Sequence, residues 1–254
     1  MLMCVLASGS KGNSIFVGRP GRGILVDAGL SCRQLLKRMK QAGIDPGWVE
    51  ALVITHEHTD HIQGAGTLAR TLGVKMAASP GTWQAMGRIK GVEQLHLPPG
   101  QELALGGLRI RAFSVVHDAA DPIGLVVEAE GRRVGIATDM GLVTHLVLTR
   151  LTGCQALVVE ANHDPALLAS GPYPPQLKQR IASTHGHLSN PAAARMLAQL
   201  MHQDLNWVVL AHLSEENNRP ELAMAPARRV LAAMARPPRL TVACQHAPTP
   251  VIEL

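Results

Sequence analysis

An uninterrupted polar stretch, His56 to His61, follows the apolar run Leu52–Ile54 and carries the residue types best suited to chemistry. In an extended chain, residues two apart point to the same side, so His56 and His58 should converge. A helix that begins after them would aim Asp60 and His61 at the same point. Imidazole nitrogens and carboxylate oxygens suit zinc, manganese or iron and do not suit calcium cages or thiolate sites. A polar loop with Asp60 as a helix cap is the alternative, but a cap needs one acid and no histidines.

Other candidate ligands each follow an apolar run that we predict to be a strand. Strand ends that gather at one rim let a rigid scaffold present ligands together. We therefore expect one metal ion at His56, His58 and His117 with Asp139, and a second at Asp60, His61 and His212 with Asp139 as the bridge. Two ions that share a hydroxide can assist hydrolysis at neutral pH. Asp27 and Glu160 follow strands in the same way.

Asp27 precedes Ala28-Gly29 and allows two interpretations. It can accept an imidazole N–H and so fix the tautomer of a metal-binding histidine. It can equally be an ordinary turn aspartate before a glycine. The local sequence favours neither.

Composition narrows the class of protein. The chain has 254 residues, enough to bury a large core, and only 2% are aromatic. A net charge of +5 favours an anionic partner such as nucleic acid, although basic residues form no run. Four cysteines without a CxxC pair indicate reduced thiols, and no signal peptide or membrane span is predicted. We expect a cytoplasmic protein without membrane contact, and nothing in the sequence predicts its oligomeric state.

Periodicity predicts alternating strands and helices with no linker or repeat, so we expect one domain over residues 1–254. Helices are predicted at 31–42, from the histidine stretch to about 73, at 82–86, 191–201 and 226–234. A Pro-rich loop is predicted around 171–175. The strands are predicted at 1–7, 15–17, 24–26, 51–55, 74–78, 108–113, on the approach to His117, and at 124–129, 133–138, 154–160, 207–211 and 240–243.

The ordered motifs THEHTDH at 55–61, DAG at 27–29, His117, TDMG at 138–141 and His212 resemble the metallo-β-lactamase superfamily. This resemblance implies an α+β fold, the four-layer αββα sandwich, with the ligands on the residues named above. An acid at Asp139 resembles the two-metal hydrolases, because antibiotic-degrading members usually have cysteine there. The short interval between Asp139 and Glu160 leaves no room for the extra domain of the β-CASP nucleases.

Further strings most resemble the YycJ/WalJ group, which is described as 5′-to-3′ DNA exonucleases. They are LASGSKGNS at 6–14, VVHDAADPIG at 115–124, EANHD at 160–164, GPYPPQLKQRI at 171–181 and GHLSN at 186–190. The resemblance implies a phosphodiesterase that uses two divalent ions, zinc or manganese or iron, on DNA. The alternatives are a tRNA 3′-end endoribonuclease, a small-molecule hydrolase acting on thioesters or cyclic phosphodiesters, and a binding protein with a structural metal.

The catalytic and substrate-binding residues are also implied by resemblance. Glu160 and His187 resemble the pair proposed in tRNase Z to protonate the leaving oxygen, and Asp60 joins them as a ligand that also serves catalysis. His163, His185 and Ser189 lie in the same strings and are candidates to contact substrate. Lys178 and Arg180 would meet phosphates and Tyr173 would stack on a base. A solvated helix start and a packed loop tyrosine are the simpler explanations of these last three.

Overall fold

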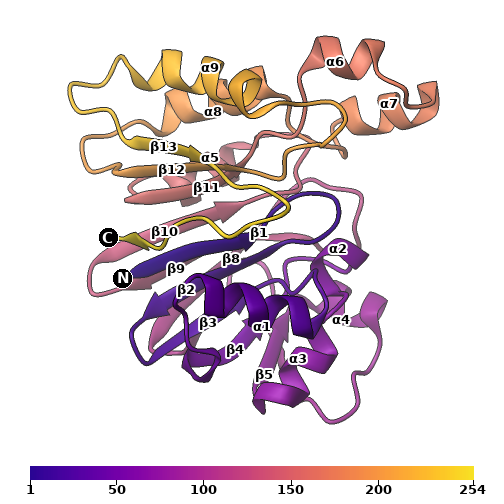
Figure 1. Ribbon diagram of the computed structural model, residues 1–254, viewed down its shortest axis with the longest axis vertical. Coiled ribbons are helices and arrows are strands. Elements are labelled where there is room, and N and C mark those ends of the chain that lie inside the picture. Colours follow the sequence, from indigo (N-terminus) through magenta and orange to yellow (C-terminus); the bar gives the residue numbers. More distant parts are fainter.

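Two seven-stranded mixed sheets lie face to face in the computed structural model, which describes residues 1–254 (Figure 1). The first sheet has the order β14-β1-β2-β3-β4-β5-β6. Strands β1 to β3 are antiparallel, and β3 to β6 run parallel to one another. The bounds are β1 Leu2–Ala7, β2 Ser14–Arg19, β3 Arg22–Val26, β4 Val49–Val53, β5 Lys75–Ala78, β6 Gln94–His96 and β14 Ile252–Glu253.

The second sheet repeats this plan in the order β13-β12-β11-β10-β9-β8-β7. Strands β7 to β10 form an antiparallel meander, and β10 to β13 are parallel. The bounds are β7 Glu102–Leu105, β8 Leu108–Ser114, β9 Ile123–Ala129, β10 Arg132–Ala137, β11 Ala156–Glu160, β12 Trp207–Ala211 and β13 Arg239–Val242. Parallel strands need crossover helices, which explains the helices on the outer faces.

Helices cover the outer face of each sheet, so the predicted four-layer αββα sandwich is confirmed (Figure 1). Helices α1 to α4 belong to the first sheet, and α5, α8 and α9 to the second. The short α6 and α7 project beyond the second sheet, at the end of the molecule that carries α2. The bounds are α1 Cys32–Gln41, α2 Thr59–Ile62, α3 Ala65–Leu72, α4 Pro80–Met86, α5 His145–Leu151, α6 Pro165–Ser170, α7 Pro175–Ala182, α8 Asn190–Leu200 and α9 Pro220–Leu231, with a 3₁₀ turn at Pro46–Trp48.

Alternation along the strands divides the apolar residues among three cores. In β3, Ile24 and Val26 enter the core between the two sheets, whereas Leu25 packs under the helices of the first sheet. Side chains alternate in this way because successive residues of a strand face opposite sides. The core between the sheets contains residues of both halves of the chain, so neither sheet buries its inner face alone.

Several predicted helices are confirmed with small shifts. Ser31 caps α1 by accepting from the N–H of Gln34, as its position before the helical pattern predicts. The predicted helix after the histidine stretch is two helices, α2 and α3, because the chain turns at Gly64. A Cβ atom on Gly64 would lie 2.1 Å from the carbonyl oxygen of Leu30, so only glycine permits this approach.

Other elements differ from the predictions. Residues 171–174 form the predicted Pro-rich loop, but Pro175 begins α7, and the two helices α6 and α7 that flank the loop were not predicted. Each has a proline, Pro165 or Pro175, in its first turn, where the missing N–H costs nothing. The helix predicted at 226–234 is α9, which begins at Pro220 and contains Pro226 in its interior. No separate strand approaches His117, because β8 already extends to Ser114.

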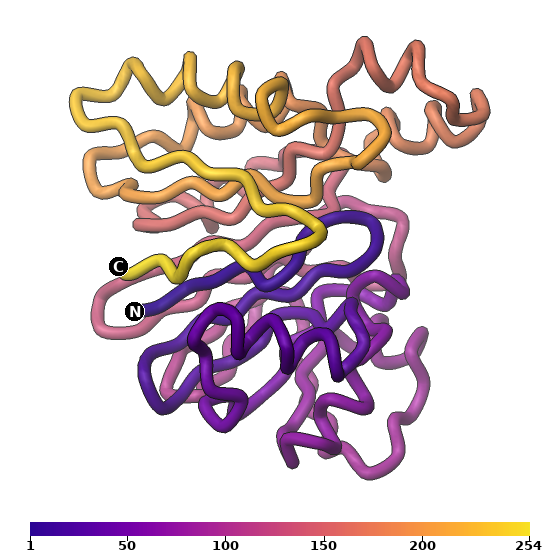
Figure 2. The backbone as a smooth tube through the Cα atoms, viewed as in Figure 1, coloured from indigo at the N-terminus to yellow at the C-terminus, as the bar shows by residue number.

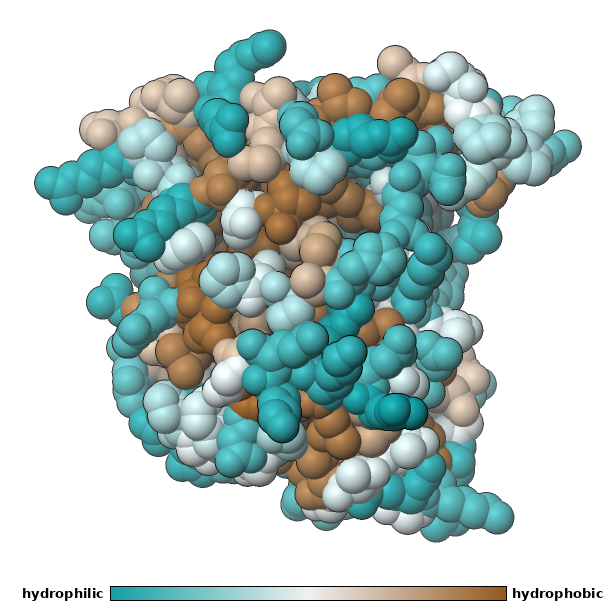
Figure 3. Space-filling view, viewed as in Figure 1, coloured by the Kyte–Doolittle hydropathy of each residue, from teal (hydrophilic) through white to brown (hydrophobic).

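The surface is mixed, with hydrophilic side chains interspersed among apolar ones over the face in Figure 3. The two chain ends lie side by side (Figure 2), and the N–H of Leu254 donates to the carbonyl of Met1. None of the helices has the length and apolar character needed to cross a membrane. All four cysteines are free, as their spacing predicts.

Candidate metal centre

The predicted ligands lie where strands end, at one rim of the sandwich. Asp27 follows β3, Asp139 lies two residues beyond β10 and His212 directly follows β12. All three have a positive φ, between 55° and 61°, which residues other than glycine rarely adopt. Such strain persists where the surrounding structure holds it, commonly at functional sites. Each turn directs a polar side chain into the space between the two sheets.

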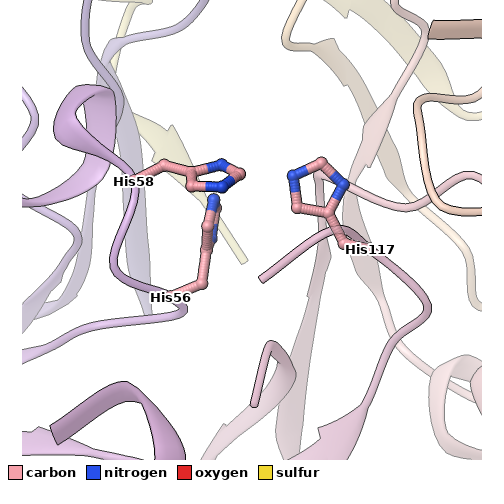
Figure 4. A group of neighbouring side chains, drawn as sticks. All are labelled: His56, His58 and His117. Atoms are coloured by element: carbon pink, nitrogen blue, oxygen red, sulfur yellow. The ribbon is translucent and has the colours of Figure 1, made fainter. Parts of the chain in front are cut away.

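His56, His58 and His117 form the first group, which we call the three-histidine pocket (Figure 4). One ring nitrogen of each lies within 4.8 Å of the others. The remaining nitrogens are held by neutral acceptors. Nδ1 of His56 lies 3.0 Å from the Thr55 hydroxyl, Nε2 of His58 lies 3.2 Å from the Asp118 carbonyl, and Nδ1 of His117 lies 3.0 Å from the Gly186 carbonyl. These contacts orient one free nitrogen of each ring toward a common point.

Asp60, His61 and His212 form the second group, which we call the mixed pocket. Its histidines are held by carboxylates. Nδ1 of His61 donates to Asp27 over 2.8 Å, and Nδ1 of His212 lies 3.1 Å from Oε1 of Glu160. Asp27 also accepts from the N–H of Thr55 at 2.8 Å. A carboxylate behind an imidazole fixes its tautomer and raises its basicity as a ligand.

Asp139 lies between the two pockets and is 3% exposed. Its Oδ2 is 3.3 Å from Nε2 of His61, and its Oδ1 is 3.4 Å from Nε2 of His212 and 4.0 Å from Nε2 of His117. It therefore reaches histidines of both groups.

Unpartnered atoms test whether this arrangement fits a metal. Nε2 of His56, Nε2 of His117 and Oδ2 of Asp139 are buried without a hydrogen-bond partner. A buried polar atom without a partner costs about 1–3 kcal/mol. Three such atoms at one centre, all nitrogen or carboxylate oxygen, have the donor chemistry that divalent zinc, manganese and iron accept. The residues fit a divalent metal centre.

Electrostatics distinguish the two pockets. Burial lowers the pKa of His56 well below its usual value, with neighbouring His61 adding to the effect, and burial likewise lowers the pKa of His117. In the mixed pocket, burial alone would lower the pKa values, but carboxylates outweigh it. Asp139 and Asp27 raise the pKa of His61 well above its usual value, and Asp139, Asp60 and Glu160 raise that of His212 to about 10.

Glu160 accepts four hydrogen bonds at the end of β11 and is fully buried. Its Oε1 accepts from Nδ1 of His187 at 2.7 Å and faces His212, while its Oε2 accepts from the N–H groups of Met140 and Leu188 at 3.0 and 3.1 Å. Although burial opposes ionisation, the charge and hydrogen bond of His187, together with the hydrogen bond of His212, lower the pKa of Glu160 to about 2. Glu160 is thus a fixed anion that leaves Nε2 of His187 free.

Some predicted substrate residues line one pocket beside His187. Tyr173 and Arg180 lie in its wall. Lys178 instead donates to the carbonyl of Ala169. His185 is exposed and lies outside this pocket, and Ser189 caps α8 by accepting from the N–H of Ala192.

His163 differs from the other candidates because it is only 3% exposed. Burial lowers its pKa, and Nδ1 has no hydrogen-bond partner. It offers a substrate little surface.

Two residues at the centre were not predicted. Asn13, in the loop between β1 and β2, reaches Oδ2 of Asp60 at 3.2 Å. Asp118 lies beside His117, with Oδ1 3.2 Å from its Nε2, and pairs with Arg180. Asp118 directly follows His117 in the sequence, and this position could have indicated its role. No local sequence pattern indicated the role of Asn13.

A family profile and two related proteins place this chain in one family, and a solved structure shares its fold. The profile of the β-lactamase superfamily domain matches residues 22–212. Exodeoxyribonuclease YycJ of Bacillus anthracis is 38% identical over 231 residues, covering 89% of this chain and 88% of that protein. Exodeoxyribonuclease WalJ of Streptococcus pneumoniae is 36% identical, covering 86% and 84%. The metallo-β-lactamase-fold protein YhfI of Bacillus subtilis superposes with a TM-score of 0.73 over 98% of both chains at 16% identity.

Proposed function

Because the chain belongs to the metallo-β-lactamase superfamily, and within it to the YycJ group, we propose that this metal-dependent hydrolase is a DNA exonuclease that digests from the 5′ end. The observation that carries the proposal is the pair of ligand groups that share Asp139. Two groups around one carboxylate provide for two ions, and a dinuclear centre suits phosphodiester hydrolysis.

In this proposal His56, His58 and His117 would hold one ion, and Asp60, His61 and His212 would hold the other. Asp139, which reaches histidines of both groups, would contribute to both. When bound, the two ions supply a nucleophile at neutral pH and stabilise charge on the phosphate oxygens. Zinc, manganese and iron all accept this donor set, so availability decides among them.

The protein residues around the ions have separate tasks. Asp27 fixes the tautomer of His61, since its carboxylate accepts the Nδ1 proton. Glu160 holds His187 by its Nδ1 and keeps it oriented. Nε2 of His187, which lines the pocket beside the centre, donates a proton to the departing sugar oxygen. Asp60 combines its role as a ligand with the positioning of the attacking water.

The substrate assignment depends on the relatives and on the pocket beside His187. Both YycJ and WalJ are named exodeoxyribonucleases. Tyr173 and Arg180 offer this chain a stacking surface and a cation for phosphate. His185 and Ser189 lie on the segment that carries His187 and would contact the strand beyond it, as would Lys178 and His163 after a local rearrangement.

Incubation with end-labelled nucleic acids tests the function directly. The protein, loaded with manganese and separately with zinc, is given single- and double-stranded DNA and RNA, labelled at either end. We expect DNA to be degraded with early release of the 5′ label, at a rate that falls steeply with salt because phosphate contacts release counterions. Hydrolysis of bis-p-nitrophenyl phosphate or a thioester without any action on DNA or RNA would favour the small-molecule alternative. Cleavage of RNA only would favour the tRNA-processing alternative.

A further inference from the structure

A pocket of about 190 Å³ opens beside His187, between α7 and the loops that follow the strands. Tyr173, Leu177 and Arg180 form the wall on the α7 side. Asn162 and Ser214, which follow β11 and β12, and Ser10 line the other side. One wall thus offers an aromatic ring, an aliphatic side chain and the Arg180 guanidinium, and the other offers amide and hydroxyl groups. Asp118 also lines the pocket and pairs with Arg180, so a phosphate there would compete with this carboxylate for the guanidinium. A nucleotide has the complementary parts in its base, phosphate and sugar.

The α7 wall is fixed to the catalytic segment. The N–H of His187 donates to the carbonyl of Ile181 over 2.9 Å. At Gly186 a Cβ atom would lie 2.2 Å from the carbonyl oxygen of Arg180, so the two backbones touch where only glycine fits. Arg180 also pairs with Asp118 at 2.5 Å, next to His117. The pocket therefore keeps a constant position relative to His187 and the metal ligands.

The position of the pocket relative to the scissile phosphate determines which part of the substrate it can bind. In an in-line displacement at phosphorus, the attacking water and the leaving oxygen lie on opposite sides. The group that protonates the leaving oxygen stands on the leaving side. His187 lines this pocket, so the pocket receives the part of the substrate that departs.

We propose that this pocket binds the 5′-terminal nucleotide of the strand and limits each cycle to one nucleotide. The inference rests on the proposed 5′-to-3′ exonuclease function. Water adds to phosphorus, the bond between phosphorus and O3′ of the terminal nucleotide breaks, and O3′ takes the proton from His187. The products are a nucleotide with a free 3′-hydroxyl and a chain that begins with a 5′-phosphate. The pocket of about 190 Å³ is on the scale of one nucleoside, which favours one residue of the strand over two.

The polarity can be tested with a sulfur atom at the bridging position. A sulfur leaving group needs no proton, so His187→Ala should lose about 10²–10⁴-fold on ordinary DNA but much less on DNA with 3′-bridging sulfur at its first linkage. A 5′-bridging sulfur should give no such rescue. Rescue by the 5′-bridging sulfur instead would mean that O5′ leaves, and the pocket would then hold a 3′-terminal residue, which overturns the proposal.

Filling the pocket tests where the terminal nucleotide binds. Leu177→Trp should lower kcat/KM on DNA about tenfold relative to kcat/KM on bis-p-nitrophenyl phosphate, because the larger side chain competes with the nucleotide. Gln179→Trp, on the exposed face of the same helix, is the matched control and should change neither. If Leu177→Trp releases 5′ mononucleotides at the rate of the original protein, the pocket assignment is wrong while the nuclease function stands. If the original protein has no action on DNA, the proposed function fails first.

Discussion

The three-histidine pocket and the mixed pocket each contain three candidate ligands, but the groups that hold their histidine rings differ in charge. The histidines of the first are oriented by a hydroxyl and two backbone carbonyls, and burial lowers the pKa values of His56 and His117. Those of the second are backed by Asp27 and Glu160, and their pKa values are raised. The first pocket is therefore neutral and ready for an ion, whereas the second must release protons when an ion binds.

This difference implies that the two pockets attract and hold a metal ion in different ways. Charge in the mixed pocket increases its attraction for a cation, and Glu160 connects that pocket to His187. In the three-histidine pocket the groups that hold the rings are a hydroxyl and two carbonyls, and the Asp118 carboxylate beside His117 is the neighbouring charge outside the pocket. The four predictions that follow test the comparison, from the largest expected effect to the smallest.

Asp139→Ala should affect both pockets together, because Asp139 lies within 4.0 Å of histidines from each. We expect turnover to fall below detection and the metal content to drop from two ions per chain, as measured by elemental analysis. Asp204→Ala, which removes an exposed acid elsewhere, serves as the control. Full occupancy and normal rates in Asp139→Ala would refute the bridge.

His187→Ala should separate catalysis from metal binding. His187 contacts Glu160 and belongs to neither pocket, although with Asp139, Glu160 and His212 it forms a further group that could hold a metal ion. We expect the ion content to stay the same while turnover on DNA falls about 10²–10⁴-fold. The loss should be smaller on a p-nitrophenyl ester, whose leaving group needs no proton. Loss of an ion would show that His187 is a ligand, and equal losses on both substrates would assign it to phosphate positioning.

Asp27→Asn should weaken the mixed pocket more than the three-histidine pocket. The change removes the negative charge behind His61 without removing its size, and loss of such a partner typically lowers metal affinity about 10–100-fold. Asp27 reaches the three-histidine pocket only through the Thr55 hydroxyl, which donates to Asp27 and contacts Nδ1 of His56. Stepwise titration with the metal should therefore show one strongly weakened ion and one that changes less. Asp204→Asn provides the charge-matched control. Equal weakening of both ions would mean that the pockets are not independently supported.

The pH dependence of the metal-free protein should differ between the pockets. The pKa of His212 is about 10 when folded and about 6.5 when unfolded, so its stabilising contribution is complete below pH 6.5 and is lost as the pH rises toward 10. We expect Tm to fall by on the order of 5 °C over this interval. Burial lowers the pKa of His56 in the folded protein. As the pH falls below 6.5, the unfolded state therefore takes up a proton at this residue before the folded state does, and the protein loses stability.

Thermal melting across this pH range measures both effects. His212→Asn should reduce the alkaline fall, and the remainder belongs to His61, whose pKa is also raised. His56→Asn should reduce the acidic fall, to which His117 also contributes. Metal-loaded protein should not show the alkaline fall, because bound ions require deprotonated imidazoles. An alkaline fall of undiminished size in His212→Asn would contradict the assignment.

Local patterns in the sequence predicted the residues that meet at the centre, because each follows an apolar strand and strand ends share a rim. Asp27, Asp139 and His212 illustrate this, although their positive φ angles were not predictable. The αββα layering was predicted from the resemblance to a known superfamily. The alternation of apolar and polar residues identifies strands but does not show which strands pair. Helices α6 and α7 were missed because prolines in the first turn of a helix look like a loop in the sequence. Asn13 and Asp118 were missed because their roles depend on distant partners.

Each pocket joins segments that follow strands of both sheets. Asp60 and His212 are separated by 152 positions, and His58 meets a loop carbonyl 60 positions away. Contacts this distant in sequence carry a large loop-closure cost during folding. Ions bound in these pockets would therefore act as cross-links between the two sheets and would stabilise the native state by mass action. Removing them with a chelator would lower stability across the interface of the sheets and would leave the local order of each helix and hairpin largely unchanged.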